Sequence, residues 1–173
     1  MFKTILTPVF GGVVLYTLLM LVVDAQQAHF TNGVIWIFRI AVIGAVILAI
    51  VNTRIHQKGL LSYRQGLLAG VAATLSMSIL LSLHTLAHRT LIYPTYHEEH
   101  KAIYAGILAR ERDRENPEKL KWTPEQIDVQ LNQRWRLYFT TEGQMAISFL
   151  GAFAIGLMTT VTAAYMARST QKK

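Results

Sequence analysis

Four long apolar stretches limit what this chain of 173 residues can fold into. They cover residues 5–23, 34–51, 66–87 and 145–167. Each can cross a bilayer core as a helix, which takes about 20 residues for a thickness of about 30 Å. Arg39 is the only Asp, Glu, Lys or Arg residue within them, and at 52% apolar residues the chain is more hydrophobic than a water-soluble core requires. We therefore expect an all-α integral membrane protein with four transmembrane helices, forming one membrane domain over residues 1–173.

The distribution of basic residues predicts how the chain is oriented. Seven Lys and Arg residues have no acidic neighbour, and they account for the net charge of +7. They are Lys3, Arg54, Lys58, Arg64, Arg168, Lys172 and Lys173. Because cytoplasmic segments of membrane proteins are enriched in Lys and Arg, we expect both termini in the cytoplasm of a bacterium and the protein in its inner membrane. The charges follow the ends of apolar segments, so the pattern does not favour nucleic-acid binding.

The connection before the last span is predicted to form a helical periplasmic insert over about residues 97–138. Residues 97–115 have the pattern of a first helix. At the start of a second helix, Thr123 can cap, Pro124 takes the first helical position and Gln126 completes a capping box. A similar box from Thr141 to Gln144 is expected to start the last span.

An apolar stripe on the second insert helix is a candidate partner-binding face. It consists of Ile127, Leu131, Trp135 and Tyr138, which recur at helical spacing. Two other roles remain open for it. The two insert helices can pack on each other, or they can lie on the membrane surface.

Small residues recur every four positions along the apolar stretches and predict close helix packing. Lipid tails are as apolar as leucine, so helix contact in a membrane relies on small side chains that let backbones approach. The third span has Gly66, Gly70, Thr74, Ser78 and Ser82; the fourth has Ser148, Ala152, Gly156, Thr160 and Ala164; the second has Ala41, Ala45 and Ala49. The stripes indicate either a tight four-helix bundle or a docking face for another membrane protein.

Basic and histidine side chains near the outer ends of the spans form a candidate ligand site. At a rise of about 1.5 Å per residue, His84, His88 and Arg89 reach the outer boundary of the third span, at the expected level of Arg39. Two arginines and two histidines in one layer can hold a lipid phosphate. The alternative is that Arg39 pairs with Asp24 and that these side chains reach the interface without binding a ligand.

The histidines also raise the possibility of a zinc site. His84 and His88 lie four residues apart, and His97 and His100 flank two glutamates. Imidazole and carboxylate are the ligands that Zn²⁺ takes when no cysteine is present. The chain has no cysteine. The segment from His97 to His100 does not match the HExxH pattern of metalloproteases. Interface histidines without a metal are the alternative, and no other cofactor is expected.

Catalysis finds little support in the sequence. It contains no nucleophile motif and no Gly-rich phosphate loop, and no acidic residue lies within a span. We therefore expect a small structural or accessory subunit of the inner membrane. It would pack with partner membrane proteins, or with itself, through the small-residue stripes or the insert. The alternative function is a lipid-headgroup- or metal-binding membrane protein that uses the outer Arg and His residues.

The order of elements resembles a bacterial membrane family known as domain of unknown function 4199. The resemblance rests on the four spans, the short basic second connection, the opening of the third span at residues 63–70 (Tyr-Arg-Gln-Gly-Leu-Leu-Ala-Gly), and the small residues from Gly151 to Thr160. It covers nearly the whole chain. It implies a four-span fold with a helical outer insert and a membrane location, and it implies no activity. The two histidine pairs are not part of the family pattern.

Overall fold

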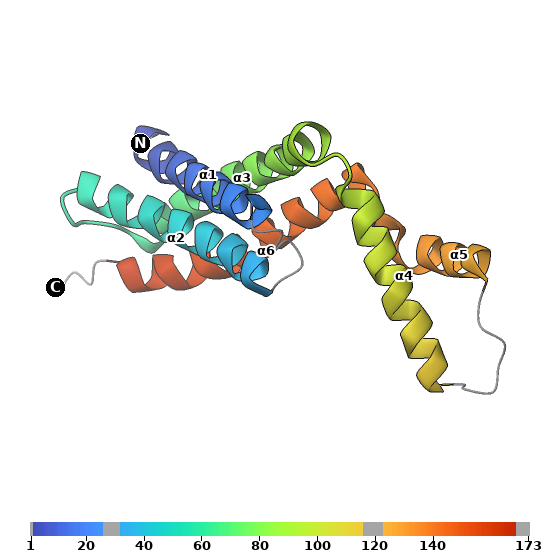
Figure 1. Ribbon diagram of the computed structural model, residues 1–173. Coiled ribbons are helices and arrows are strands. Elements are labelled where there is room, and N and C mark those ends of the chain that lie inside the picture. Colours follow the sequence, from blue (N-terminus) through green and yellow to red (C-terminus); the bar gives the residue numbers. More distant parts are fainter. Residues whose placement is uncertain (1, 26–31, 116–122, 169–173) are drawn as a thin grey trace. The chain divides into compact units, whose positions relative to one another are not determined.

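Helices make up all the regular structure in the computed structural model, which describes residues 2–25, 32–115 and 123–168 (Figure 1). No strand occurs among these residues. In chain order the elements are α1 (Phe2–Ala25), α2 (Asn32–His56), α3 (Tyr63–Ala87), the π-helical η1 (His88–Ile92), α4 (Tyr96–Glu115), α5 (Pro124–Trp135), the 3₁₀-helical η2 (Arg136–Tyr138) and α6 (Thr141–Ala167).

Four helical segments are long and apolar enough to cross a membrane, as predicted. They are Lys3–Ala25, Gly33–His56, Tyr63–Ile92 and Thr141–Ala167. The third segment continues beyond its predicted end at residue 87, because α3 passes into η1 without a break in helical structure. The four segments indicate a multi-pass membrane protein.

Local signals end α2 and start α3 within a short connection. Lys58 and Gly59 both adopt positive φ, at 54° and 85°, and the Gly59 N–H donates to the Arg54 carbonyl at 2.9 Å. This left-handed ending is typical of helix C-termini. Ser62 and Gln65 then form a capping box, in which the Gln65 N–H donates to Ser62 Oγ at 3.3 Å and the Ser62 N–H to Gln65 Oε1 at 3.0 Å.

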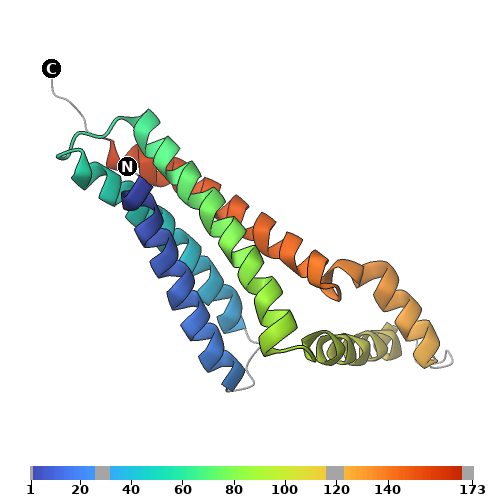
Figure 2. The same ribbon diagram turned by 90° about the horizontal axis from the view of Figure 1, so that it is seen from above.

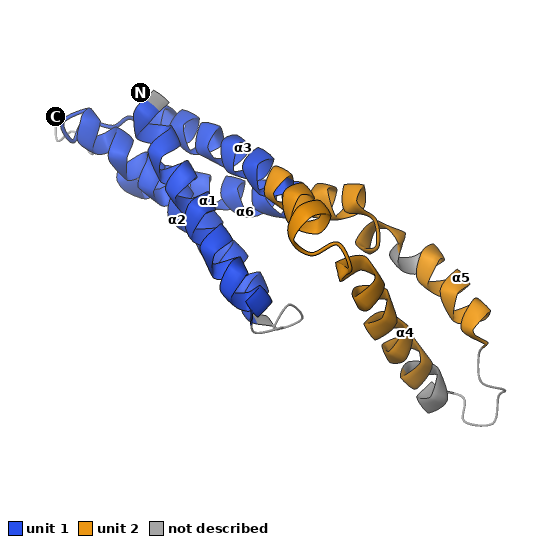
Figure 3. Cartoon of the chain, turned by 45° about the horizontal axis from the view of Figure 1, so that its top comes forward, with its two compact units in different colours: residues 1–82, 148–173 blue, residues 83–147 orange. Residues whose placement is uncertain are grey.

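The chain forms two compact units (Figure 3). The first, the membrane unit, comprises residues 1–82 and 148–173. The second, the insert unit, comprises residues 83–147 and contains η1, α4, α5 and η2. Helices α3 and α6 each contribute one end to the insert unit, so the predicted insert of residues 97–138 lies entirely within it.

The membrane unit is held together by small residues that let its helices approach closely. A Cβ built on Gly70 would lie 2.5 Å from Thr160 Cγ2, and one on Gly156 would lie 2.6 Å from Thr74 Cγ2. Since real Cβ contacts are not this short, glycine is required at both positions. The buried Thr74 and Thr160 hydroxyls hydrogen-bond to each other at 3.2 Å. The small-residue faces of α3 and α6 therefore pack on each other.

Helices α1 and α2 make a second close contact in the membrane unit. The two helices lie side by side (Figure 2). A Cβ on Gly12 would lie 3.1 Å from Ala45 Cβ, and Ala41, Ala45 and Ala49 are all buried. The stripe predicted on the second span is thus part of the interior.

Large apolar side chains cover the outside of the membrane unit. Among the most exposed are Leu18, Ile40, Ile55, Leu150, Met158 and Met166, each more than half exposed. A contiguous apolar surface of this kind is an aggregation hazard in water but matches the hydrocarbon of a bilayer. The exposed faces and the buried small residues together fit a bundle surrounded by lipid.

We expect Gly70→Ala to lower the thermal unfolding midpoint of the protein in a mild detergent. The added methyl would overlap the Thr160 side chain and push α3 away from α6, at a cost of about 1–3 kcal/mol. Gly44→Ala is the matched control, because a Cβ at Gly44 meets nothing within 4 Å. Equal midpoints for the two variants would contradict the close packing of α3 on α6.

Candidate functional site

The insert unit begins at a π-helical turn that positions Arg89. In η1 the Tyr93 N–H donates to the His88 carbonyl at 2.8 Å, which gives the wider five-residue turn of a π-helix. Such turns occur frequently at functional sites. The Arg89 guanidinium lies over the Tyr96 ring, with Cζ 3.0 Å from the ring centroid. This cation–π contact joins η1 to the start of α4.

An aromatic cluster forms on one face of α4. Tyr96, His100 and Tyr104 follow each other at four-residue spacing, and Phe139 joins them from the turn after η2. The His100 ring centroid lies 4.9 Å from those of Tyr96 and Tyr104 and 6.1 Å from that of Phe139. Tyr96 is 7% exposed and His100 is 8% exposed. The cluster therefore buries a histidine among aromatic rings.

Burial and the positive charge of Arg89 favour the neutral form of His97 and His100. Burial, reinforced by Arg89 and His97, lowers the pKa of His100 from 6.5 to about 4. Burial and then Arg89 also lower the pKa of His97, against a smaller opposing effect of Glu142. Burial raises the pKa of Tyr96, although Arg89 opposes it. Near neutral pH the cluster thus carries no charge on its histidines.

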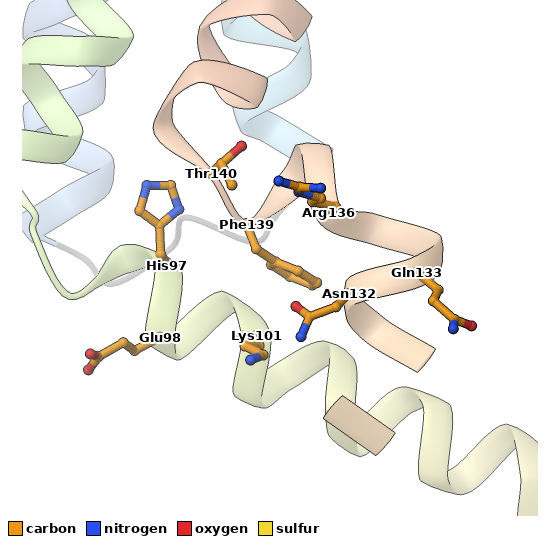
Figure 4. Close-up of a pocket in the computed structure, with 8 residues that line it drawn as sticks. All are labelled: His97, Glu98, Lys101, Asn132, Gln133, Arg136, Phe139 and Thr140. Carbon is orange, nitrogen blue, oxygen red and sulfur yellow. The ribbon is translucent and has the colours of Figure 1, made fainter. Parts of the chain in front are cut away.

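A pocket of about 510 Å³ lies beside the aromatic cluster (Figure 4). It is lined by His97, Glu98, Lys101, Asn132, Gln133, Arg136, Phe139 and Thr140. Of these residues, Lys101 of α4 pairs through Nζ with Asp128 Oδ1 of α5 at 2.5 Å. Asn132 Nδ2 donates to the other carboxylate oxygen of Asp128 at 3.3 Å, so this acid joins the two helices that form the pocket walls.

Helix caps hold the segments around the pocket. The predicted capping box at the start of α5 is confirmed: Gln126 N–H donates to Thr123 Oγ1 at 3.3 Å, and Thr123 N–H donates to Gln126 Oε1 at 3.1 Å. The predicted cap of the last span is wrong by one residue, because the Gly143 N–H donates to Thr140 Oγ1 at 3.2 Å. Thr140 therefore caps α6 and also lines the pocket.

Gly143 is a structural requirement that the sequence analysis missed. A Cβ at this position would lie 2.0 Å from the Leu137 carbonyl oxygen, so no other residue fits without moving the backbone. The neighbouring Gln144 side chain donates from Nε2 to the Tyr138 carbonyl at 2.7 Å. These contacts fold the turn between η2 and α6 onto the first turn of α6. No local motif in the sequence signals such a close approach.

The structure brings only part of the predicted Arg and His layer into one unit. His84, His88 and Arg89 belong to the insert unit, where the His84 and His88 rings stack at 5.7 Å and Arg89 turns onto Tyr96. Arg39 belongs to the membrane unit, and its guanidinium lies 5.1 Å from the Trp36 ring. The two arginines thus each contact an aromatic ring.

The structure does not gather the four histidines of the predicted zinc site into one described group. Within the described parts of the chain, no group of three or more His, Cys, Asp or Glu residues is placed to hold a metal ion. His84 stacks on His88, His97 Nε2 lies 3.0 Å from Thr141 Oγ1, and His100 is enclosed by aromatic rings. Each of these histidines therefore contacts a different set of neighbours, and zinc binding stays a prediction.

The residues of the predicted partner-binding stripe differ in exposure. Leu131 is 1% exposed and Ile127 is half-buried, whereas Tyr138 remains 38% exposed. The side chain of Trp135 lies outside the part of the structure that is described. Leu131 is therefore an interior residue of the insert unit rather than a docking residue.

A family model described as a protein of unknown function, DUF4199, matches residues 7–169. No curated protein and no solved structure matches the chain.

We expect the stability of the protein to fall as the pH drops from about 6.5 to about 4, and His100→Phe to make this fall smaller. The pKa of His100 is lower in the folded than in the unfolded chain, so unfolding takes up a proton in this range and becomes easier as the pH drops. Phenylalanine keeps an aromatic ring in the cluster but cannot be protonated. Thermal unfolding midpoints at pH 7 and pH 4.5 measure the effect.

His56→Gln is the control for this experiment, since His56 is an exposed residue of α2 outside the insert unit. It should keep the pH dependence of the original protein. If His100→Phe shows the same fall in midpoint as His56→Gln, the buried histidine is not the group responsible.

Proposed function

The chain belongs to the family described as protein of unknown function, DUF4199, and from this premise we propose that it is a small structural or accessory subunit of the bacterial inner membrane. In this proposal both termini are cytoplasmic and the insert unit is periplasmic. The unbalanced basic residues at the two ends of the chain and in the connection between α2 and α3 support that orientation.

The insert unit is the docking element in this proposal, because the small-residue stripes are already used within the chain. Gly70 and Gly156 receive the side chains of Thr160 and Thr74, and the alanines of α2 are buried. A partner helix that needs small residues for close approach finds those of α2, α3 and α6 occupied. This internal use of the stripes is the observation that carries the proposal.

Exposed apolar side chains on the insert unit supply a surface for a partner. Ile103 and Ile107 of α4 are 40% and 44% exposed, Val129 of α5 is 52% exposed, and Leu137 of η2 is 63% exposed. Burying one such side chain fully at an interface contributes about 1.5–3 kcal/mol. These four apolar side chains stand among the polar residues of α4 and α5. Their exposure is easier to explain if the insert docks on a partner than if it contacts only water.

We expect partner proteins to co-purify with the chain from native membranes in a gentle detergent, and Val129→Asp with Leu137→Asp to reduce their yield several-fold. The two carboxylates would have to be desolvated at the interface. Quantitative mass spectrometry of the purified complexes measures the loss. Arg110→Asp, an exposed change on α4 that leaves the apolar side chains in place, should retain the partners.

Two results would contradict the docking role of the insert. One is that the original protein always purifies alone as a monomer. The other is that all three variants lose partners equally, since a specific apolar surface should not respond to a charge change at Arg110.

A further inference from the structure

The pocket beside the aromatic cluster is lined by two basic side chains, several polar side chains and one aromatic ring. We propose that this pocket, between α4 and the α5–η2 segment, binds the phosphate group of a small phosphate ester. The proposal goes beyond the docking role of the insert, because the pocket residues differ from the exposed apolar residues assigned to a partner.

The side chains of the pocket differ in how they are directed. Asn132 extends from α5 toward α4, and the His97 ring rises from α4 on the side of Thr140 (Figure 4). Glu98 and Gln133 point away from the enclosed space (Figure 4). The acidic side chain of the lining is thus turned outward, while Arg136 lines the pocket from η2 as an exposed side chain.

Arg136 is a positive group of the pocket for which the described residues supply no counter-ion. Lys101 is paired with Asp128 at 2.5 Å. His97 is neutral near pH 7, because burial and the charge of Arg89 lower its pKa. Arg136 is exposed, and none of the described residues forms an ion pair with it. An anionic ligand would therefore complete the charge balance at Arg136.

The hydrogen-bond donors fit a phosphate. The Arg136 guanidinium can donate two parallel hydrogen bonds to a phosphate, and Lys101 Nζ has donors beyond the one that Asp128 accepts. Thr140 Oγ1 accepts the Gly143 N–H, so its own hydroxyl hydrogen is left to donate. A phosphate has more acceptor oxygens than a carboxylate and can carry a second negative charge, so it can use more of these donors.

The remaining lining accommodates the organic part of the ester. Phe139 supplies an apolar wall, and the Asn132 amide carbonyl can accept a hydrogen bond from a ligand hydroxyl. A volume of about 510 Å³ lies within the ordinary range of small-ligand pockets. A phosphorylated small polyol meets these requirements, either as a free ester or as the headgroup of a phospholipid.

Binding of glycerol 3-phosphate to the full-length protein in a non-ionic detergent tests the proposal. We expect saturable binding in isothermal titration calorimetry at constant salt. Arg136→Gln should weaken it about tenfold or more, as the loss of a charge-assisted hydrogen bond would. Asn132→Asp, an exposed change that adds a negative charge to the lining, should also weaken it. Unfolding midpoints equal to that of the original protein establish that both variants are folded.

Arg110→Gln is the matched control, because Arg110 is an exposed arginine of α4 that does not line the pocket. It should bind glycerol 3-phosphate as the original protein does. A second arm compares nanodiscs of phosphatidylglycerol with nanodiscs of phosphatidylcholine. Binding of the free ester alone assigns a soluble ligand, whereas an Arg136-dependent preference for phosphatidylglycerol assigns a lipid headgroup.

Three results would overturn the proposal. The first is that neither glycerol 3-phosphate nor phosphatidylglycerol binds saturably. The second is that Arg136→Gln and Arg110→Gln weaken binding equally, which indicates unspecific attraction. The third is that benzoate binds as tightly as glycerol 3-phosphate, which indicates a site for carboxylates.

Discussion

Close approach of helices at glycine is the constraint on which the membrane unit depends. A bilayer offers no hydrophobic gain for bringing two apolar helices together, so their association relies on van der Waals contact and on buried polar pairs. Gly70 and Gly156 provide the contact by receiving Thr160 and Thr74, and the two threonine hydroxyls bond to each other. These residues are therefore occupied inside the chain, and the large apolar side chains of the unit form its exposed faces.

The insert unit is stabilised in a different way, by an interior of its own. Its buried residues include Leu108 and Leu131, together with Tyr96 and His100 of the aromatic cluster. Arg89 contributes to both structure and electrostatics, since it packs on Tyr96 and helps to keep His97 and His100 neutral. Of these residues His97 also lines the neighbouring pocket, together with the charged Glu98, Lys101 and Arg136. Packing and electrostatics in this unit are therefore linked through a few side chains.

Some local features could be predicted from the sequence and others could not. The box of Thr123 and Gln126 was predicted correctly, because its hydrogen bonds join residues three positions apart. The cap of α6 was assigned to Thr141 rather than Thr140, because two adjacent threonines precede the span and either can cap a helix. The requirement for Gly143 was missed, because it depends on the Leu137 carbonyl folding back onto α6. The zinc hypothesis placed His97 and His100 in one site, but their rings engage Thr141 and the aromatic cluster. The pocket was missed because its walls come from distant segments.

The sequence by itself determined that the chain has four apolar helices and a polar helical insert. A bilayer selects each segment by its own length and polarity, and these properties can be read along the chain. Only the tertiary structure decided which small residues meet and which side chains line the pocket. Those contacts depend on how each helix is rotated about its axis, and several rotations satisfy the same apolar pattern. Close packing at Gly70 and Gly156, and the fold of the turn at Gly143, select one of them.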